Sequence, residues 1–355
     1  MIRGAAAAAS DSSAAAAAQA VIEAGGSAVD AVIAGFFGAA GAHPGVLFAP
    51  AIALVAGFGA GGRVFDGRAA QPGRGAPRPR GFVDDAGIPG GAYVAVPRSI
   101  SMLMLLSSYL GKGSLGELAR DGVTAAEAGG ATARADLIRK VGAGGVLALR
   151  TTEVSRALLA VGGTVAGGAL TAEDIDEAAP GEAEATATTL GEGASAITVY
   201  TPPFPVPLDA GILGNARERS PTGAERGDSE AIVACDSRGL YAAIAYDPAR
   251  GGVAVPGLEV TLGRWAVPVR RGVTRLAPGT LLPAPAPVAI AVRNGGFAAA
   301  VGLPGRQRIE IDLVAELVRG AAMETALADL REKAGGRSAV AVITDGKTAR
   351  AALMS

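Results

Sequence analysis

The pattern of apolar and polar residues changes along the chain. Before residue 176, helical patterns alternate with glycine turns, and after Ser229 short apolar runs alternate with turn residues. Residues 14–24 are alanine-rich and end at Gly25-Gly26, which predicts a helix with a glycine C-cap. The other expected helices span residues 27 or 28 to 40, 99–110 and 114–121, with further helical patterns over 124–176.

The part after Ser229 favours β-hairpins. Asn294-Gly295 lies between two apolar runs, and Asn-Gly is the strongest short hairpin signal. The expected strand pairs are 231–235 with 240–246, 288–292 with 296–301, and 338–344 with 348–354, and a helix is expected over 309–318. A helix-rich half followed by a sheet-rich half predicts strands packed between layers of helices.

Three other segments have a distinct character. Residues 46–58 are typical of a glycine-punctuated loop and a buried strand, residues 64–66 of a strand end, and residues 70–91 of a loop. Residues 177–230 are acidic, then threonine-rich, then proline-rich and finally charged. We expect a mobile surface segment over 215–228.

Composition narrows the classes of function. The chain has 355 residues, of which 50% are hydrophobic and 18% charged, so it can bury a large core. Its formal net charge of −1 argues against a nucleic-acid-binding surface. With one cysteine (Cys235) and one histidine (His43), an internal disulfide and a multi-histidine metal site are excluded, and no cofactor is expected. His43 is interpreted as structural rather than catalytic.

The N-terminal alanine run does not have the pattern of a signal peptide. Polar residues 10–13 interrupt it, and it continues into domain sequence. No other stretch reaches transmembrane length without Gly, Pro or charge. We therefore expect a cytoplasmic protein with no membrane partner.

Six segments, in order along the chain, resemble motifs of the γ-glutamyltranspeptidase family. The matching segments are Glu23–Ala31 (GGNAVDA), Phe65–Pro72 (DxRExAP), Val94–Pro97 with Tyr109–Gly111 (VPGxxxG…YG), Gly167–Asp174 (GGxLTxxDL), Gly227–Ser229 with Asp236 and Gly239 (GDTxHxSVVDxxG), and Gly302–Gly305 (GxPGG). Together they span nearly the whole chain, which is shorter than a usual member between the proline-rich segment and Ser229.

The resemblance implies an N-terminal-nucleophile (Ntn) hydrolase fold, an α/β/β/α sandwich of two stacked, largely antiparallel sheets between helical layers. It implies one domain over 1–355, with a helix-rich large-subunit-like part, 1–228, and a sheet-rich small-subunit-like part, 229–355. In this family, self-cleavage exposes a threonine whose hydroxyl attacks a γ-glutamyl amide, with its own α-amine as base. Ser229 stands at the position of that threonine, and a strand-entry serine is the alternative interpretation.

The resemblance also implies other site residues. Arg68 matches the arginine that holds the substrate carboxylate, for which the guanidinium fork is suited. The glycine pair of the oxyanion hole corresponds to Gly305 and Arg306, and any non-proline N–H can serve there. Asp247 or Asp209 is a candidate for binding the substrate amino group if the fold brings either near the site.

Several positions depart from the family pattern. Ala231 and Val233 replace a histidine and a serine, and the residues after the next strand are Asp247-Pro248-Ala249. Proline-rich residues 283–287 replace paired serines, and residues 263–265 (Gly-Arg-Trp) replace an Asn/Asp cluster that holds the substrate amino group. We therefore expect little or no γ-glutamyl transfer from glutathione.

Two hypotheses of different class follow. The chain is an acyl-transfer or amide-hydrolysis enzyme acting through Ser229 on a small-molecule amide or γ-glutamyl substrate, or it is an uncleaved, non-catalytic homologue that serves as a binding or assembly module. In the second case its partner is another protein or a second copy of the chain. The retained Arg68 and Gly227-Asp228 favour the first hypothesis, and the lost polar pocket favours the second.

Overall fold

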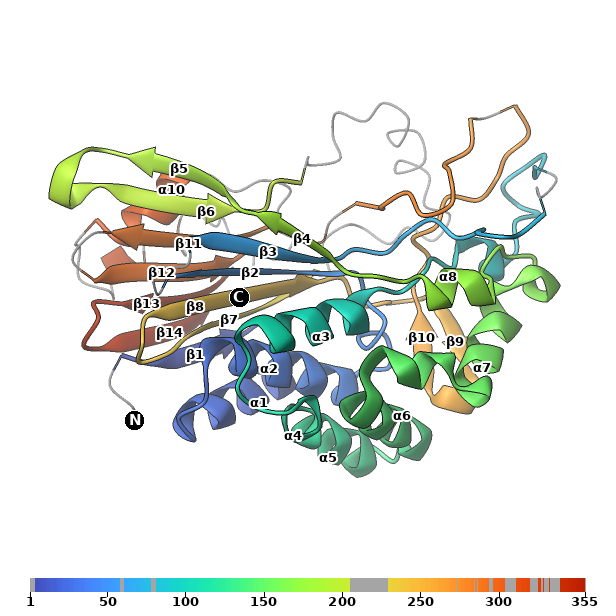
Figure 1. Ribbon diagram of the computed structural model, residues 1–355, viewed down its shortest axis with the longest axis horizontal. Helices are drawn as coiled ribbons and strands as arrows, with labels where there is room; N and C mark the ends of the chain where they lie inside the picture. Colours follow the sequence, from blue (N-terminus) through green and yellow to red (C-terminus); the bar gives the residue numbers. More distant parts are fainter. Residues whose placement is uncertain are drawn as a thin grey trace.

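Two antiparallel six-stranded sheets form the centre of the molecule in the computed structural model (Figure 1). It describes residues 4–57, 61–77, 81–204, 229–272, 274–283, 285, 287–293, 296–303, 311–319 and 339–354, and four single positions between 325 and 332. The strands of the first sheet, in spatial order, are β1 (Ala6–Ala9), β7 (Glu230–Cys235), β8 (Leu240–Tyr246), β2 (Ala51–Gly57), β3 (Gly62–Gly67) and β4 (Gly181–Glu184).

The second sheet lies against one face of the first. Its strands, in spatial order, are β14 (Ala349–Met354), β13 (Ala339–Thr344), β12 (Phe297–Gly302), β11 (Val288–Arg293), β6 (Ile197–Thr201) and β5 (Thr186–Leu190). All neighbouring strands in both sheets are antiparallel. In the first sheet, β7 and β8 from after Ser229 lie between β1 and β2 from before it, so the register of this sheet depends on distant parts of the chain.

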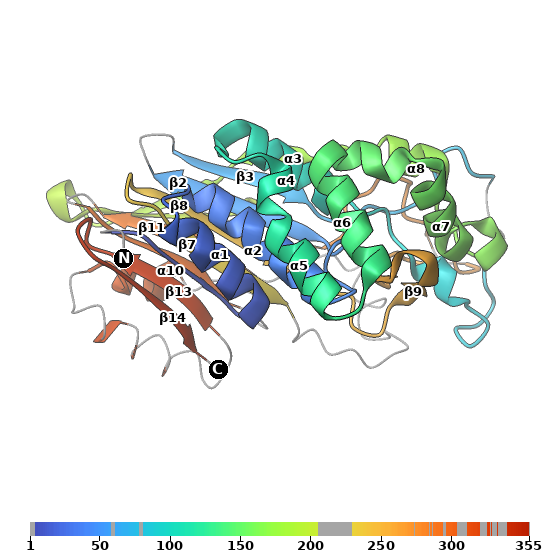
Figure 2. The same cartoon turned by 90° about the horizontal axis from the view of Figure 1, so that it is seen from below.

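Helices cover the outer faces of both sheets (Figure 2). Helices α1 (Ser12–Glu23) and α2 (Ala28–Ala42) cover the first sheet, and Asp11 and Ser27 cap their N-termini through side-chain hydrogen bonds. Helix α10 (Ile311–Glu316) packs on the second sheet. The expected sandwich of two sheets between helical layers is therefore confirmed.

The remaining helices extend the first helical layer to one side of the sheets (Figure 2). They are α3 (Ser99–Leu110), α4 (Leu115–Leu118), α5 (Arg120–Ala128), α6 (Thr132–Gly144), α7 (Thr152–Gly162) and α8 (Ala172–Asp176), beside a two-stranded ribbon of β9 (Val253–Val255) and β10 (Val260–Leu262). A Cβ added at Gly41 of α2 would lie 2.0 Å from the carbonyl oxygen of Gly122. Glycine is therefore needed where α2 and α5 cross.

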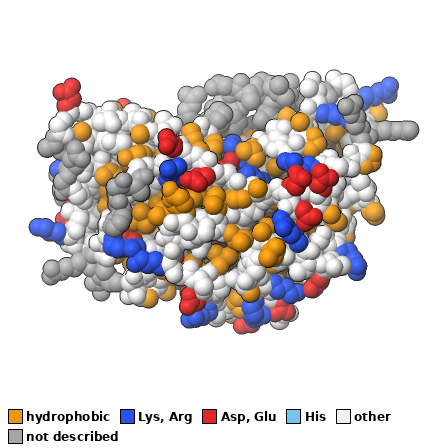
Figure 3. All heavy atoms as spheres, in the orientation of Figure 1, with side chains coloured by type: hydrophobic (Ala, Val, Ile, Leu, Met, Phe, Trp, Pro, Cys, Tyr) orange, Lys and Arg blue, Asp and Glu red, His pale blue; other side chains and the backbone are white. Residues whose placement is uncertain are grey.

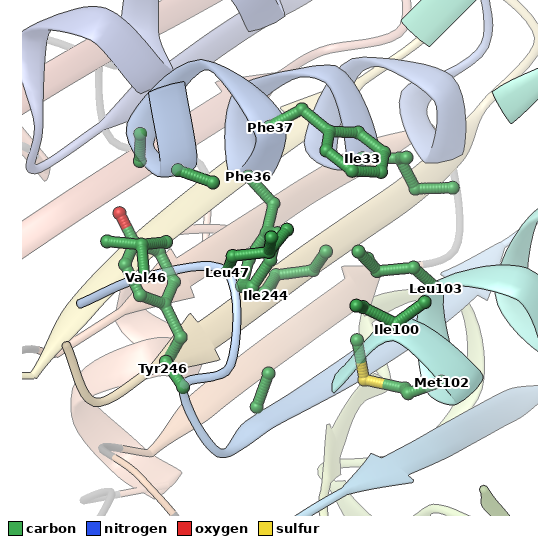
Figure 4. Packing of buried hydrophobic residues seen from close by; sticks show 14 of the residues in the cluster. Ile33, Phe36, Phe37, Val46, Leu47, Ile100, Met102, Leu103, Ile244 and Tyr246 are labelled. Carbon is green, nitrogen blue, oxygen red and sulfur yellow. The ribbon is translucent and has the colours of Figure 1, made fainter. Parts of the chain in front are cut away.

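The core combines small aliphatic residues with a few large rings. Alanine, valine, leucine and isoleucine dominate it, but Phe36, Phe37, Phe65 and Tyr246 are also fully buried. The rings of Phe36 and Tyr246 meet edge to face, 5.3 Å apart, between α2 and β8 (Figure 4). Burial raises the pKa of the Tyr246 phenol well above its ordinary value.

Six strands lie in segments for which the sequence predicted none: β1, β4, β5, β6, β9 and β10. Residues 6–9 are four alanines, which favour helix intrinsically, yet they form β1 because they pair with β7. Strands β4, β5 and β6 lie in the acidic and threonine-rich part of 177–230. The expected mobile segment over 215–228 lies outside the described residues.

The face of the molecule shown in Figure 3 carries both acidic and basic side chains. Acidic and basic side chains lie close together, and apolar side chains gather across the middle of the face. On α3, Tyr109 is 45% exposed and packs edge-on against Phe65.

Within the described part of the chain, no helix has the length and apolar character that crossing a membrane requires.

Candidate functional site

Ser229 immediately precedes β7, an internal strand of the first sheet. Glu230, the first residue of β7, pairs with Tyr246, which pairs with Ala51, which in turn pairs with Gly67. The residues one step beyond this row are Ser229, Asp247, Pro50 and Arg68. The strand register therefore places Ser229, Asp247 and Arg68 at one end of the same sheet.

Antiparallel pairing also decides which face these residues share. Ala231 and Ala245, two positions further into the sheet, face the second sheet. Because side chains alternate along a strand, Ser229 and Asp247 extend the same inter-sheet face. Neighbouring strands lie about 4.8 Å apart, so the Arg68 backbone is about 10 Å from that of Asp247.

The Ser229 hydroxyl donates a hydrogen bond to the Asp247 carboxylate. Asp247 is held from its backbone: its N–H donates to the Pro50 carbonyl over 3.1 Å, and the Ala249 N–H donates to the Gly45 carbonyl over 2.8 Å. These bonds fix the chain on both sides of Pro248. The carboxylate is thus positioned over the serine by the loop that follows β8, which is hydrogen-bonded to the segment preceding β2.

A second link joins the same two segments on the opposite face of the sheet. The Arg250 guanidinium donates to the Glu230 carboxylate over 2.7 Å, and the Ser10 hydroxyl donates to the same carboxylate. The Ser10 oxygen also accepts from the Ala231 N–H over 2.9 Å. Residues 229–231 are therefore anchored by β1 on one side and by the 247–250 loop on the other.

Arg68 forms a two-bond ion pair with Asp66. Its Nε donates to Oδ1 over 3.1 Å and its Nη2 to Oδ2 over 3.0 Å. Arg98 lies on the same carboxylate, 3.8 Å away, and donates to the Ala179 and Arg68 carbonyls. Burial lowers the pKa of the Arg98 guanidinium, and the neighbouring Asp66 acts in the opposite direction.

An aromatic ring from the second sheet covers Arg68. Phe204, just beyond β6, places its ring centroid 3.9 Å from the guanidinium carbon. The Arg68 side chain is only 12% exposed. Residues of both sheets thus surround Arg68, whose guanidinium makes a cation–π contact with Phe204 as well as the ion pair with Asp66.

The two sheets approach closely beside Ser229. A Cβ added at Gly302, the last residue of β12, would lie 2.3 Å from the Cβ of Ala231. The end of β12 therefore packs directly on the beginning of β7. The predicted oxyanion residues Gly305 and Arg306, three and four positions further on, lie outside the described residues.

The structure shows where several residues that depart from the family pattern lie. Ala231 and Val233 are fully buried in the layer between the sheets. Trp265 folds back over Gly263, since a Cβ there would lie 2.1 Å from its ring. The backbone of Arg264 bridges to Val94. His43 Nε2 lies 2.8 Å from Oδ2 of Asp11, which joins the end of α2 to the cap of α1.

Sequence reasoning missed three residues around Arg68. Asp66 belongs to the matched segment, and two residues at spacing two on a strand share a face, which is a signal for this ion pair. Arg98 and Phe204 gave no such signal, because 30 residues separate Arg98 from Arg68 and Phe204 comes from the other sheet. Over the described residues, no three His, Cys, Asp or Glu side chains are grouped to hold a metal ion.

No family model and no curated protein sequence matches the chain. Among solved structures, cephalosporin acylase from Bacillus halodurans aligns with a TM-score of 0.62 at 15% identity, covering 82% of this chain and 76% of that one. Two structures of LmbA2991 align with TM-scores of 0.60 and 0.57 at 17% and 18% identity, each covering 99% of this chain and 98% of the other. The chain has the Ntn-hydrolase fold.

Sequence identities of 15–18% to these solved structures establish that the architecture is shared, but they do not establish that the chemistry is shared. Membership of the γ-glutamyltranspeptidase family remains a resemblance in six motifs. Any activity therefore depends on the arrangement of Ser229, Asp247 and Arg68 in this chain.

Proposed function

We propose that the chain is an Ntn-type enzyme that hydrolyses an amide or transfers its acyl group, with Ser229 as the nucleophile. The observation that carries this proposal is the hydrogen bond from Ser229 to Asp247 at the beginning of β7. A hydroxyl is a weak nucleophile at neutral pH and needs an adjacent proton acceptor. A serine that only began a strand would not require a carboxylate held on it by a fixed loop.

The position in the fold supports the same role. Ser229 lies at the end of an internal strand and faces the layer between the sheets, where Gly302 brings β12 against β7. Self-cleavage between Asp228 and Ser229 would make this serine an N-terminal residue. Its hydroxyl would then attack the carbonyl carbon of the substrate amide, and the amine would leave.

The substrate in this proposal is not a γ-glutamyl amide. Both hydrogen-bonding edges of the Asp66 carboxylate engage Arg68, and the Phe204 ring covers the guanidinium. A substrate carboxylate would have to compete for Arg68 with the Asp66 carboxylate, whose side chain is only 5% exposed. We therefore propose that a neutral acyl group occupies the site and that Arg68 organises its wall.

Intact-mass measurement during prolonged incubation tests self-cleavage. We expect wild type to yield two fragments that divide at Asp228–Ser229 and the Ser229→Ala variant to remain whole. Turnover of a panel of acyl p-nitroanilides by wild type, abolished in Ser229→Ala, would establish the enzyme. Hydrolysis that survives in the variant would refute Ser229 as the nucleophile.

The non-catalytic hypothesis is the second candidate, and the occupied guanidinium of Arg68 favours it. In that case wild type stays a single full-length mass and no member of the anilide panel is turned over. Binding of another protein or self-association would then be the activity to measure.

A further inference from the structure

We infer that the Asp247 carboxylate, rather than the α-amine of Ser229, takes the proton from the Ser229 hydroxyl. This inference rests on the proposed function, because it concerns how the same serine is activated. The contact is direct: the hydroxyl of Ser229 already donates to Oδ1 of Asp247 in the uncleaved chain. The acceptor for the proton is therefore in place before any α-amine exists.

The surroundings of Asp247 hold it in this position. Its own N–H is bonded to Pro50, and Pro248 restricts the backbone that follows. Arg250, three residues on, is tied to Glu230 on the opposite face of the sheet. Ser229 and Glu230 are consecutive, so the loop contacts both faces of the same strand end. Such two-sided attachment limits the movement of the carboxylate relative to the hydroxyl.

Charge argues against the α-amine as base once the chain is cleaved. The new α-ammonium of Ser229 would lie next to the Asp247 carboxylate, because it belongs to the residue that carboxylate contacts. An opposite charge at this distance stabilises the protonated amine. The amine would thus hold its proton more firmly than a free α-amine does, and it would be less available as a base at neutral pH.

The steps balance without any further reactant. As the Ser229 oxygen bonds to the substrate carbonyl carbon, its proton passes to Asp247. Asp247 then returns the proton to the amide nitrogen as the carbon–nitrogen bond breaks, leaving an acyl ester on Ser229. Water attacks this ester, gives its proton to Asp247, and the serine oxygen recovers a proton as the acid leaves. With an amine in place of water, the acyl group is transferred.

The test uses p-nitrophenyl acetate on the self-cleaved protein with both fragments present, so that the α-amine of Ser229 exists, and it follows acetylation of Ser229 by mass spectrometry between pH 4 and 9. We expect the acylation rate constant to stay level between about pH 6 and pH 9, as a carboxylate base would give. An amine base would instead give a rise centred near pH 8.

Three variants separate the possible outcomes. Asp247→Asn keeps an oxygen acceptor for the hydroxyl but is a far weaker base, so we expect acylation to fall about 100-fold or more at pH 7. Asp136→Asn, an exposed aspartate on α6, is the matched control and should acylate as wild type does. Thermal unfolding of each variant checks that the fold is intact.

Two results would overturn the inference: acylation of Asp247→Asn within threefold of wild type, or a rise centred near pH 8. Either would leave the proposed function standing, provided that Ser229→Ala is not acylated. Equal labelling of Ser229→Ala and wild type would instead show that Ser229 is not the nucleophile, which would refute both the proposed function and the inference.

Discussion

Arg68, one residue beyond the end of β3, is joined to Asp66 of that strand by two parallel hydrogen bonds on the face between the sheets. Asp66 is 5% exposed, and its carboxylate is also 3.8 Å from Arg98. One buried carboxylate thus balances two guanidinium groups. The relationship limits what Arg68 can offer to a substrate, and it contributes to the stability of this end of the sandwich.

We expect Asp66→Asn to lower the free energy of unfolding by about 3 kcal/mol or more, because it leaves two buried cations without their shared anion. Urea unfolding measures the loss. Glu182→Gln is the control, since it removes an exposed pair with Arg63 of the neighbouring strand and should cost less than about 1 kcal/mol. Equal losses in the two variants would mean that the Asp66 pair is not a buried ion pair in solution.

The occupied Arg68 also predicts substrate preference. If the proposed function holds, a neutral acyl p-nitroanilide should be hydrolysed with a higher kcat/KM than the γ-glutamyl anilide, by about 100-fold or more. The γ-glutamyl group carries a carboxylate and an ammonium. Among the described residues at the positions that match the family's substrate-binding residues, none offers an unoccupied partner for either charge. Preference for the γ-glutamyl anilide would contradict this prediction and support the family's substrate.

Gly302 should be required for the contact between β12 and β7. Gly302→Ala places a Cβ 2.3 Å from that of Ala231, so we expect a loss of about 1–3 kcal/mol in the free energy of unfolding. Gly257→Ala is the matched control, because a Cβ there meets nothing within 4 Å.

The pair can also be tested by exchange. Gly302→Ala combined with Ala231→Gly removes the clash, and the double variant should recover much of the loss, giving a non-additive cycle. If the two substitutions are additive, the sheets do not meet at these residues.

Cys235 predicts a pH dependence of stability. Burial raises the pKa of its thiol to about 12, with the Ala6 backbone acting the other way. In the unfolded chain the thiol ionises near pH 8.5, so its contribution is present below that pH and is lost as pH rises toward 12, at up to about 1.4 kcal/mol per pH unit.

Urea unfolding at pH 8, 9 and 10 checks this, with Cys235→Ala for comparison. Wild type should lose stability more steeply than the variant over this range. Burial also raises the pKa of Tyr241 to about 12, but that phenol titrates in the unfolded state only near pH 10 and is present in both proteins. Parallel pH profiles would show that the thiol is accessible in the folded state.

Local signals in the sequence were sufficient for much of the fold. Helix α3 lies at the predicted residues 99–110, and α1 and α2 begin at side-chain caps that the sequence shows. The three predicted hairpins are present as β7–β8, β11–β12 and β13–β14. Each depends on residues within one turn or one hairpin of each other, which is the range over which propensity and turn chemistry act.

The candidate site was predictable only in part. Family motifs identified Ser229 and Arg68 as residues of interest, and Asp247 was a candidate for binding a substrate amino group. That Asp247 contacts the serine itself depends on the register of β7 against β8 and on the bonds of its loop to Pro50 and Gly45. Gly305 and Arg306 remain predictions from the resemblance.

The sequence by itself determined where most helices and hairpins lie, because their signals are local. Only the tertiary structure made β1 a strand, since four alanines have no preference for one until β7 offers them hydrogen-bond partners. Only the tertiary structure placed Asp66 and Phe204 on Arg68 and Asp247 on Ser229. These contacts arise from strand register and from the stacking of two sheets, which join residues that no local pattern connects.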